Sequence, residues 1–298
     1  MTRLDWQDAT WPELQNALRR NDTEVGLVPV GATEQHGPHL PTGTGTLIAT
    51  AVCERAADIV GGLVLPAVPV GVSYGHGTVL PGTLSFSPSL LAELLKAYAT
   101  WAAESGLRRL LFVNAHLGNT ATIGTATDWL RLYVPQVRVG SVDWWASDPW
   151  VAAEATADGD DIHANRAETS LVMAIAPHLV RTDLLTDADD EDRTDGLVFR
   201  YTAPSLSTNG VTGRPSQATP QLGQQLLERV ARSVADRVER GRVEETPVGS
   251  GVRAALAAAG VRPAAFSTRV GRRADHAARR RPGRAGAARG ASRRPAPG

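Results

Sequence analysis

The sequence has a single cysteine, no long apolar run and a formal net charge of zero. The first two of these features each exclude a class of structure. Cys53 is the single cysteine among 298 residues, so an intrachain disulfide and a cysteine-based metal cluster are both excluded. No apolar stretch approaches the roughly 20 residues that span a bilayer. The first 20 residues are too polar for a signal peptide. We therefore expect a cytoplasmic protein that makes no use of a membrane.

The formal net charge of zero conceals two parts of opposite sign. Residues 249–298 contain 12 Arg and one Asp, whereas residues 1–248 contain 19 Lys and Arg against 30 Asp and Glu. A surface that binds phosphates needs basic residues, so the acidic part makes nucleic acid an unlikely main partner. Nucleic acid remains a candidate partner for the basic tail only.

Apolar runs and helical patterns alternate along the first part of the chain. Strands are predicted at residues 25–30, 63–70, 109–113 and 137–142, and helices at residues 46–60, 89–105, 119–133, 166–175 and 217–240. This order is typical of an α/β protein with a mainly parallel sheet covered by helices on both faces. We assign residues 1–245 to this domain.

Residues 246–298 form a tail rich in Arg, Ala, Gly and Pro, in which the periodicity disappears. A disordered basic tail is the simplest interpretation, because such a composition buries little apolar surface. A tail that binds an acidic partner and a C-terminus produced by a shifted reading frame are the two alternatives.

Candidate functional residues follow the predicted strands. Glu34 and His36 come directly after the first strand, and His116 follows the third. In parallel α/β sheets, ligands bind outside the carboxyl ends of the strands, so these side chains are expected at one edge. Carboxylate and imidazole are ligands that Zn, Mn or Fe accepts. The pattern therefore predicts a metal site.

A second cluster lies around the start of the helix predicted at residues 166–175. His163 precedes this helix and Glu168 lies in its first turns, where the helix dipole also favours a carboxylate. We assign no direct chemistry to the remaining histidines. These are His39, His76, His178 and His276.

Five segments between roughly residues 4 and 241 form a further pattern: residues 34–41, 81–85, 114–116, 163–170 and 210–216. In this order they resemble the creatininase family of metal-dependent amidohydrolases. The resemblance implies a three-layer α/β/α sandwich, a two-metal site and a homo-oligomer, often a hexamer. Family members hydrolyse C–N bonds of cyclic amides, formamides or peptides.

The resemblance also implies roles for individual residues. Glu34, His36 and His116 match metal ligands, and Glu168 is the residue expected to fill the second site. His163 matches the histidine that passes a proton to the leaving nitrogen. We expect one or two ions per chain, Zn or Mn with Fe as a further option, and a water that the ion activates to attack a small amide.

One position departs from the family pattern. Gly45 stands where the family has an aspartate that bridges both ions. A reduced site with three or four ligands is one outcome, and we expect Gly45→Asp to raise metal occupancy. Two alternatives to a small-amide hydrolase stay open: a peptidase of the mycofactocin pathway, which belongs to the same family, and a catalytically impaired homologue that only binds a ligand or assembles.

Overall fold

A computed structural model of the chain describes residues 2–20 and 24–246. Five strands form its sheet, and they are β1 (Leu4–Asp5), β2 (Val25–Val30), β3 (Leu63–Val64), β4 (Arg109–Asn114) and β5 (Arg138–Asp143). The α-helices are α1 (Trp11–Arg20), α2 (Thr44–Val60), α3 (Pro88–Glu104), α4 (Thr120–Tyr133), α5 (Pro149–Ala155), α6 (Arg166–Ile175), α7 (Leu185–Ala188), α8 (Ala203–Leu206) and α9 (Pro220–Val243).

The five strands run parallel in the order β1-β3-β2-β4-β5. Strand β2 lies at the centre, and all six of its residues are buried. Its continuous apolar sequence fits a strand that is covered on both faces. Its carboxyl end is aligned with that of β4, since Val30 pairs with Asn114. The loops that follow these two strands therefore begin side by side.

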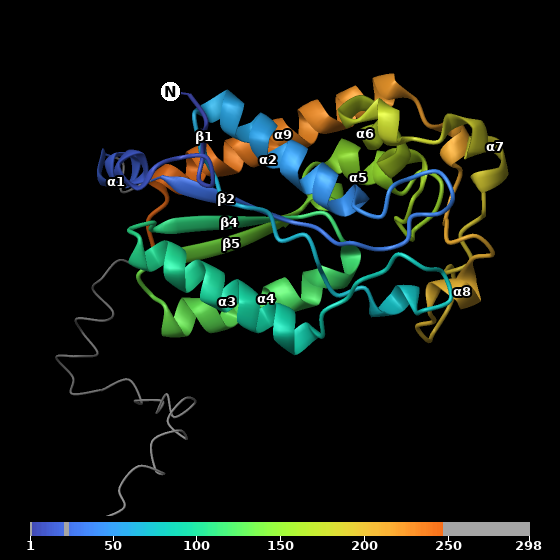
Figure 1. Cartoon of the computed structure of the whole chain (residues 1–298), viewed down its shortest axis with the longest axis horizontal. Helices are drawn as coiled ribbons and strands as arrows, with labels where there is room; N and C mark the ends of the chain where they lie inside the picture. The colour runs from blue at the N-terminus through green and yellow to red at the C-terminus, as the bar shows by residue number, and fades with distance from the viewer. Residues whose placement is uncertain (1, 21–23, 247–298) are drawn as a thin grey trace, which may run out of the picture. The chain divides into compact units, whose positions relative to one another are not determined.

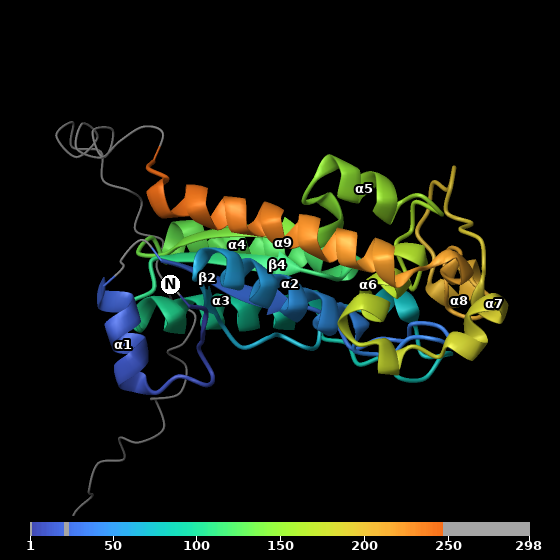
Figure 2. The same cartoon turned by 90° about the horizontal axis from the view of Figure 1, so that it is seen from above.

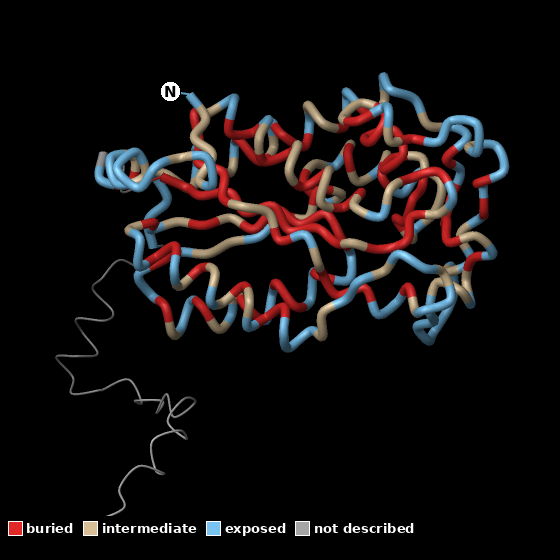
Figure 3. Tube along the Cα trace, in the orientation of Figure 1, coloured by how far each residue is buried: buried red, intermediate tan, exposed pale blue. Residues whose placement is uncertain are grey.

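Helices cover both faces of the sheet in separate layers (Figure 1). Helices α2, α5, α6 and α9 lie on one face, and α3 and α4 lie on the other. Figure 2 shows α9 running along the sheet beside α2. The burial pattern agrees, because the strands between the two layers are mostly buried (Figure 3). Two apolar cores result, one on each side of the sheet. The predicted α/β/α class is confirmed.

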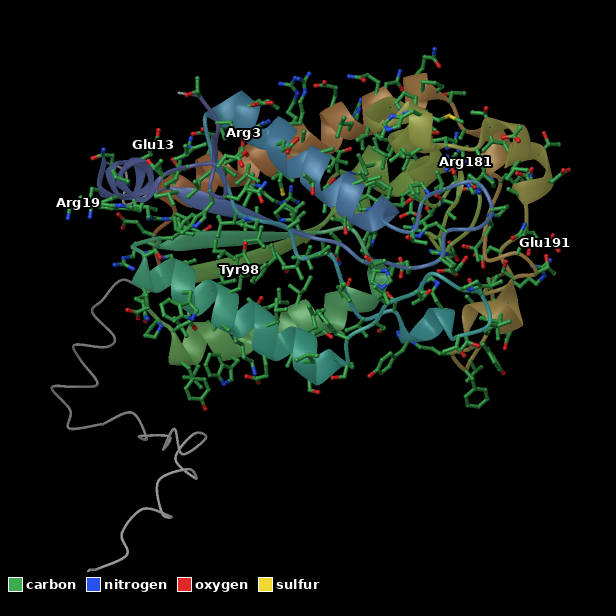
Figure 4. The ribbon with its side chains drawn as sticks, viewed as in Figure 1. Arg3, Glu13, Arg19, Tyr98, Arg181 and Glu191 are labelled. Carbon is green, nitrogen blue, oxygen red and sulfur yellow. The ribbon has the colours of Figure 1, made fainter. Side chains whose placement is uncertain are left out.

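Strand β3 is much shorter than the eight residues predicted, and proline explains the difference. The segment continues beside β2, because Leu65 N donates to Leu27 O at 2.8 Å and Val68 N donates to Pro29 O at 2.9 Å. Pro66 and Pro69 interrupt this ladder because proline has no N–H to donate. The segment is also tied to α3, since the hydroxyl of Tyr98 (labelled in Figure 4) donates to Pro66 O at 2.6 Å.

The described residues belong almost entirely to one compact unit, Met1–Glu244. The basic tail predicted for residues 246–298 lies outside the described residues, except for Thr246. Within the part of the chain that the structure describes, no helix combines the length and the hydropathy that a membrane crossing requires.

Candidate metal centre

The loop of residues 31–43 carries Glu34 and His36 from the end of β2 to the start of α2. The loop folds back on itself, because Glu34 N donates to Thr42 O at 2.8 Å. A second tie holds it to a distant segment: the backbone N–H of Arg181 (labelled in Figure 4) donates to His39 O at 2.9 Å. These bonds hold the loop beyond the carboxyl end of β2, at the end of the molecule where α7 and α8 also lie (Figure 1).

Glu34 is buried between two imidazole rings and is only 2% exposed. Its Oε1 lies 2.9 Å from His116 Nδ1, and its Oε2 lies 3.0 Å from His76 Nε2. Burial alone would raise the pKa of this carboxyl, but His116 and His76 together hold the pKa well below its usual value. Glu34 is therefore an ionised carboxylate inside the protein.

His116 follows β4 and is oriented by backbone groups on both sides. Its backbone N–H donates to Asn114 Oδ1 at 3.1 Å, and its ring Nε2 lies 2.8 Å from Val72 O. A carbonyl oxygen can only accept, so Nε2 carries a hydrogen and Nδ1 faces Glu34. Burial lowers the pKa of His116, but the carboxylate of Glu34 outweighs it and raises the pKa above the usual value.

His36 and Glu168 meet at the start of α6. His36 Nε2 lies 3.5 Å from Glu168 Oε2, and the same oxygen accepts a hydrogen bond from Ala164 N at 2.7 Å. Asn165 caps this helix, because its side chain accepts from the N–H groups of Ala167 and Glu168. Burial lowers the pKa of His36, but Glu168 and Glu34 outweigh it and raise the pKa to about 8.

His163 lies between two other rings, with centroids 4.4 Å from those of His36 and His76. Gln35 Nε2 lies 2.9 Å from His163 Nε2 and 3.1 Å from Gly210 O. Because the Gln35 amide nitrogen can only donate, His163 Nε2 accepts and the neutral ring carries its hydrogen on Nδ1. Burial, and then the charges of His36 and His76, lower the pKa of His163 well below its usual value.

No chemistry was predicted for His76, yet the structure brings it into the cluster. His76 ends a short 3-10 helix, Tyr74–His76, and is 9% exposed. A signal for it existed in the sequence. The segment follows β3, which neighbours β2 in the parallel sheet, so the rule that places Glu34 at the sheet edge also places His76 there.

Two glycines have no room for a side chain: Gly45, where the family pattern has an aspartate, and Gly118, two residues after His116. A Cβ on Gly45 would lie 2.7 Å from Ala115 O and 3.3 Å from Ala32 N, which are backbone atoms. A Cβ on Gly118 would overlap Val72 O and the ring of His116. The structure therefore gives no support to a simple restoration by Gly45→Asp.

The side chains form two groups of candidate ligand atoms that share Glu34. The first group is Glu34, His76 and His116, and the second group is Glu34, His36 and His163. Within each group the ligand atoms lie within 4.8 Å of one another. Glu34 Oε2 is buried without a hydrogen bond, so its lone pairs are available to a cation. Carboxylate and imidazole donors suit Zn and Mn, so these residues fit a divalent ion.

Fold and centre together define an α/β protein with a buried carboxylate–histidine cluster at the carboxyl ends of its strands. Comparison with known proteins identifies the family. The family model described as "Creatinine amidohydrolase" matches residues 7–238. The chain therefore belongs to the creatininase family of hydrolases, as its sequence motifs predicted.

Individual relatives include two kinds of enzyme. The chain is 29% identical to the creatinine amidohydrolase of Pseudomonas putida, over 78% of this chain and 94% of the relative. It is 33% identical to the mycofactocin precursor peptide peptidase of Mycolicibacterium smegmatis, over 72% of this chain and 84% of the relative.

Solved structures of creatininases share the fold. A creatininase variant described as of the Zn-Zn type has a TM-score of 0.72 and 28% identity, covering 82% of this chain and 100% of the other. A structure described as "Creatininase Mn" has a TM-score of 0.71 at the same identity and the same coverage.

Proposed function

We propose that this chain is a metal-dependent amidohydrolase that cleaves the C–N bond of a small amide. The observation that carries the proposal is the ionised Glu34, buried between His116 and His76 in a chain of this family. An unpaired charge in that position would be costly, and a cation beside it offsets the cost. Zn and Mn are the candidate ions, because the described structural neighbours include forms with each.

Four of the residues predicted from the sequence are proposed to hold the ion or ions: Glu34, His36, His116 and Glu168. Glu34 lies beside His116, and His36 lies beside Glu168. When bound there, a divalent ion would polarise the amide carbonyl and lower the pKa of a water molecule. Val72 O supports this role by fixing the hydrogen of His116 on the nitrogen that faces away from Glu34.

His163 is proposed to carry the proton to the leaving nitrogen. The neutral ring carries its hydrogen on Nδ1, because Gln35 donates to Nε2. A proton taken up at Nε2, in place of that hydrogen bond, would let Nδ1 release its own proton to the leaving nitrogen. The lowered pKa keeps the ring neutral at pH 7 between turnovers and makes the protonated ring a strong acid. Both properties suit a group that receives a proton and releases it at once.

A peptidase is the second candidate, and two observations favour it. The mycobacterial peptidases are 32–33% identical to this chain over more than 70% of its length. In addition, Tyr74 and Val79, on either side of His76 in the sequence, are 58% and 72% exposed. Exposed side chains with apolar surface near His76 in the sequence would suit the side chains of a peptide better than a small polar amide.

The test is a substrate screen on protein stripped with a chelator and reloaded with Zn or Mn. Creatinine, other cyclic amides, formamides and short peptides are assayed with each ion. Release of an amine from a cyclic amide or formamide supports the leading proposal, and cleavage of peptides alone supports the second. Tight metal binding without any hydrolysis supports the impaired homologue that only binds or assembles.

The proposal includes a homo-oligomer in the cytoplasm, as the family resemblance and the composition led us to expect. Light scattering on the full chain measures the oligomeric state, and a mass equal to that of one chain would remove this part of the proposal.

A further inference from the structure

We propose that His76 is a metal ligand, and that the first group, Glu34, His76 and His116, holds one divalent ion. The inference rests on the proposed function, because the ion is the one that hydrolysis needs. It differs from the set predicted from the sequence, in which His76 had no role. It also explains how a site can persist where Gly45 supplies no carboxylate.

The two oxygens of Glu34 each face one imidazole nitrogen. His116 Nδ1 lies 2.9 Å from Oε1, and His76 Nε2 lies 3.0 Å from Oε2. The second pair is close but is not aligned as a hydrogen bond, and Oε2 has no other hydrogen-bond partner. One carboxylate and two imidazole rings thus bring three candidate metal-ligand atoms together. Among the atoms of these side chains, Oε2 of Glu34 is the buried oxygen without a hydrogen bond.

The hydrogen positions leave ring nitrogens available as ligands. His116 gives its Nε2 hydrogen to Val72 O, so Nδ1 presents its lone pair to the centre. The amide of Gln35 has two hydrogens for three neighbours, and the two shorter contacts are to His163 Nε2 and Gly210 O. The longer contact, 3.2 Å to His76 Nδ1, is left over. A ring that binds an ion through Nε2 must carry its hydrogen on Nδ1, and it then gives up only this longest contact to the Gln35 amide.

The segment that carries His76 is held in place by several hydrogen bonds. Val72 N donates to Asn119 Oδ1 at 2.9 Å, and Ser73 N donates to Ser85 Oγ at 2.8 Å. Val72 O fills the space next to Gly118, where a side chain would otherwise begin. The segment thus fills the space beside Gly118 and brings the imidazole of His76 to the centre.

Three protein ligands are enough for a catalytic ion. Catalytic zinc commonly has three protein ligands and keeps its fourth position for water or substrate. The first group supplies that number without drawing on His163, whose Nε2 is taken by Gln35. The first group is therefore sufficient for one ion, which leaves His36 and Glu168 for the second ion of a two-ion site.

The test compares His76→Gln with His76→Glu in the full chain. The two replacements have nearly the same shape and reach, but only glutamate is a good zinc ligand. Zinc affinity is measured by competition with a chelator, metal content by elemental analysis, and ligand geometry by the visible spectrum of the Co(II)-loaded protein. His39→Gln is the matched control, since it removes a buried imidazole that belongs to neither group.

We expect zinc affinity in the order wild type, His76→Glu, His76→Gln. The glutamine variant should lose more than about 100-fold, which exceeds the 10–100-fold cost of losing a residue that only supports a ligand. Its Co(II) spectrum should change, and that of His39→Gln should not. A purely structural role predicts the opposite order, because a second buried carboxylate beside Glu34 is costly without an ion.

The outcomes separate this inference from the proposed function. Glutamine binding as tightly as wild type, glutamate binding more weakly than glutamine, or a wild type that binds no zinc would each overturn the inference. A wild type that needs His76 for zinc but hydrolyses no amide would leave the inference standing and remove the proposed function. Circular dichroism confirms that each variant is folded before its affinity is compared.

Discussion

The two groups that share Glu34 differ in how their remaining polar atoms are used. In the first group, the Nε2 hydrogen of His116 is taken by a backbone carbonyl, and Oε2 of Glu34 has no hydrogen bond. In the second group, His163 Nε2 already accepts from Gln35. Glu168, which lies beside that group, already accepts from Ala164 N.

This difference assigns different tasks to neighbouring side chains of the same types. Atoms with unused lone pairs at short range favour a cation, as in the first group. A ring nitrogen already satisfied by an amide favours a fixed position and a controlled proton, as at His163. Residue type alone does not separate the two cases, since each group has one glutamate and two histidines.

The largest effect is expected from Glu34→Gln, because both groups depend on this carboxylate. The substitution keeps the shape and removes the charge that faces His116 and His76. We expect zinc binding to be lost and kcat/KM to fall by about a thousandfold or more, equivalent to roughly 4 kcal/mol. Glu93→Gln is the control, since Glu93 is exposed on α3 and pairs with Lys96 of the same helix. Normal zinc content in Glu34→Gln would show that neither group binds zinc through this carboxylate, and the comparison between the two groups would be wrong.

His163→Gln should separate the two groups. We expect kcat to fall by about 10²- to 10⁴-fold, the usual contribution of a positioned acid or base, with zinc content unchanged. Elemental analysis and steady-state kinetics on the same preparation measure both quantities. The exposed His178 supplies the control variant, His178→Gln. Full activity would remove His163 from the scheme, and loss of zinc would make it a ligand.

Gly45→Asp tests whether the site can be returned to the family pattern. The structure reverses our expectation from the sequence, because a Cβ at this position meets Ala115 O at 2.7 Å. We expect no gain in zinc content and a loss of about 3 kcal/mol in the free energy of unfolding, typical of overpacking. Denaturant unfolding measures the loss.

Gly43→Asp is the matched control for that substitution. Gly43 is the N-cap of α2, and a Cβ there meets nothing within 4 Å. Aspartate is a favoured N-cap residue, so this variant should be neutral or slightly stabilised. If Gly45→Asp instead bound a second zinc ion, the backbone around Ala115 would have to be adaptable, and our account of the gap would be wrong.

The sequence predicted the fold well because the periodic apolar pattern carries it. Strand β2 and helix α6 have the predicted bounds, and the other four predicted helices differ at their ends by one to three residues. Helices α1, α5, α7 and α8 were not predicted. The edge strand β1 was missed, because two residues are too few to show any period. Glu34, His36 and His116 were found since they follow predicted strands. His76 was passed over because it lies well beyond the end of β3, and its orientation depends on bonds between distant segments, such as Val72 with Asn119.

The smallest effect concerns His39, a buried histidine beside the second group that we expect to serve stability rather than chemistry. Its Nε2 lies 2.8 Å from Thr169 Oγ1. Burial, and then the charge of His36, lower the pKa of His39 to about 4. Above pH 6.5 the ring is neutral in both the folded and the unfolded chain. As the pH falls below 6.5, only the unfolded ring takes a proton, so stability is lost progressively until about pH 4.

At pH 5 this loss amounts to about 2 kcal/mol. Glutamine at position 39 retains an amide at the place of Nε2 but does not titrate, so His39→Gln should lose that much less stability than wild type between pH 7 and pH 5. Urea unfolding of the metal-free protein at the two pH values measures the difference, and His178→Gln should follow wild type. Identical pH dependence in His39→Gln and wild type would show that His39 has the same pKa in the folded and the unfolded chain. Burial would then not lower the pKa of His39, and this explanation would be wrong.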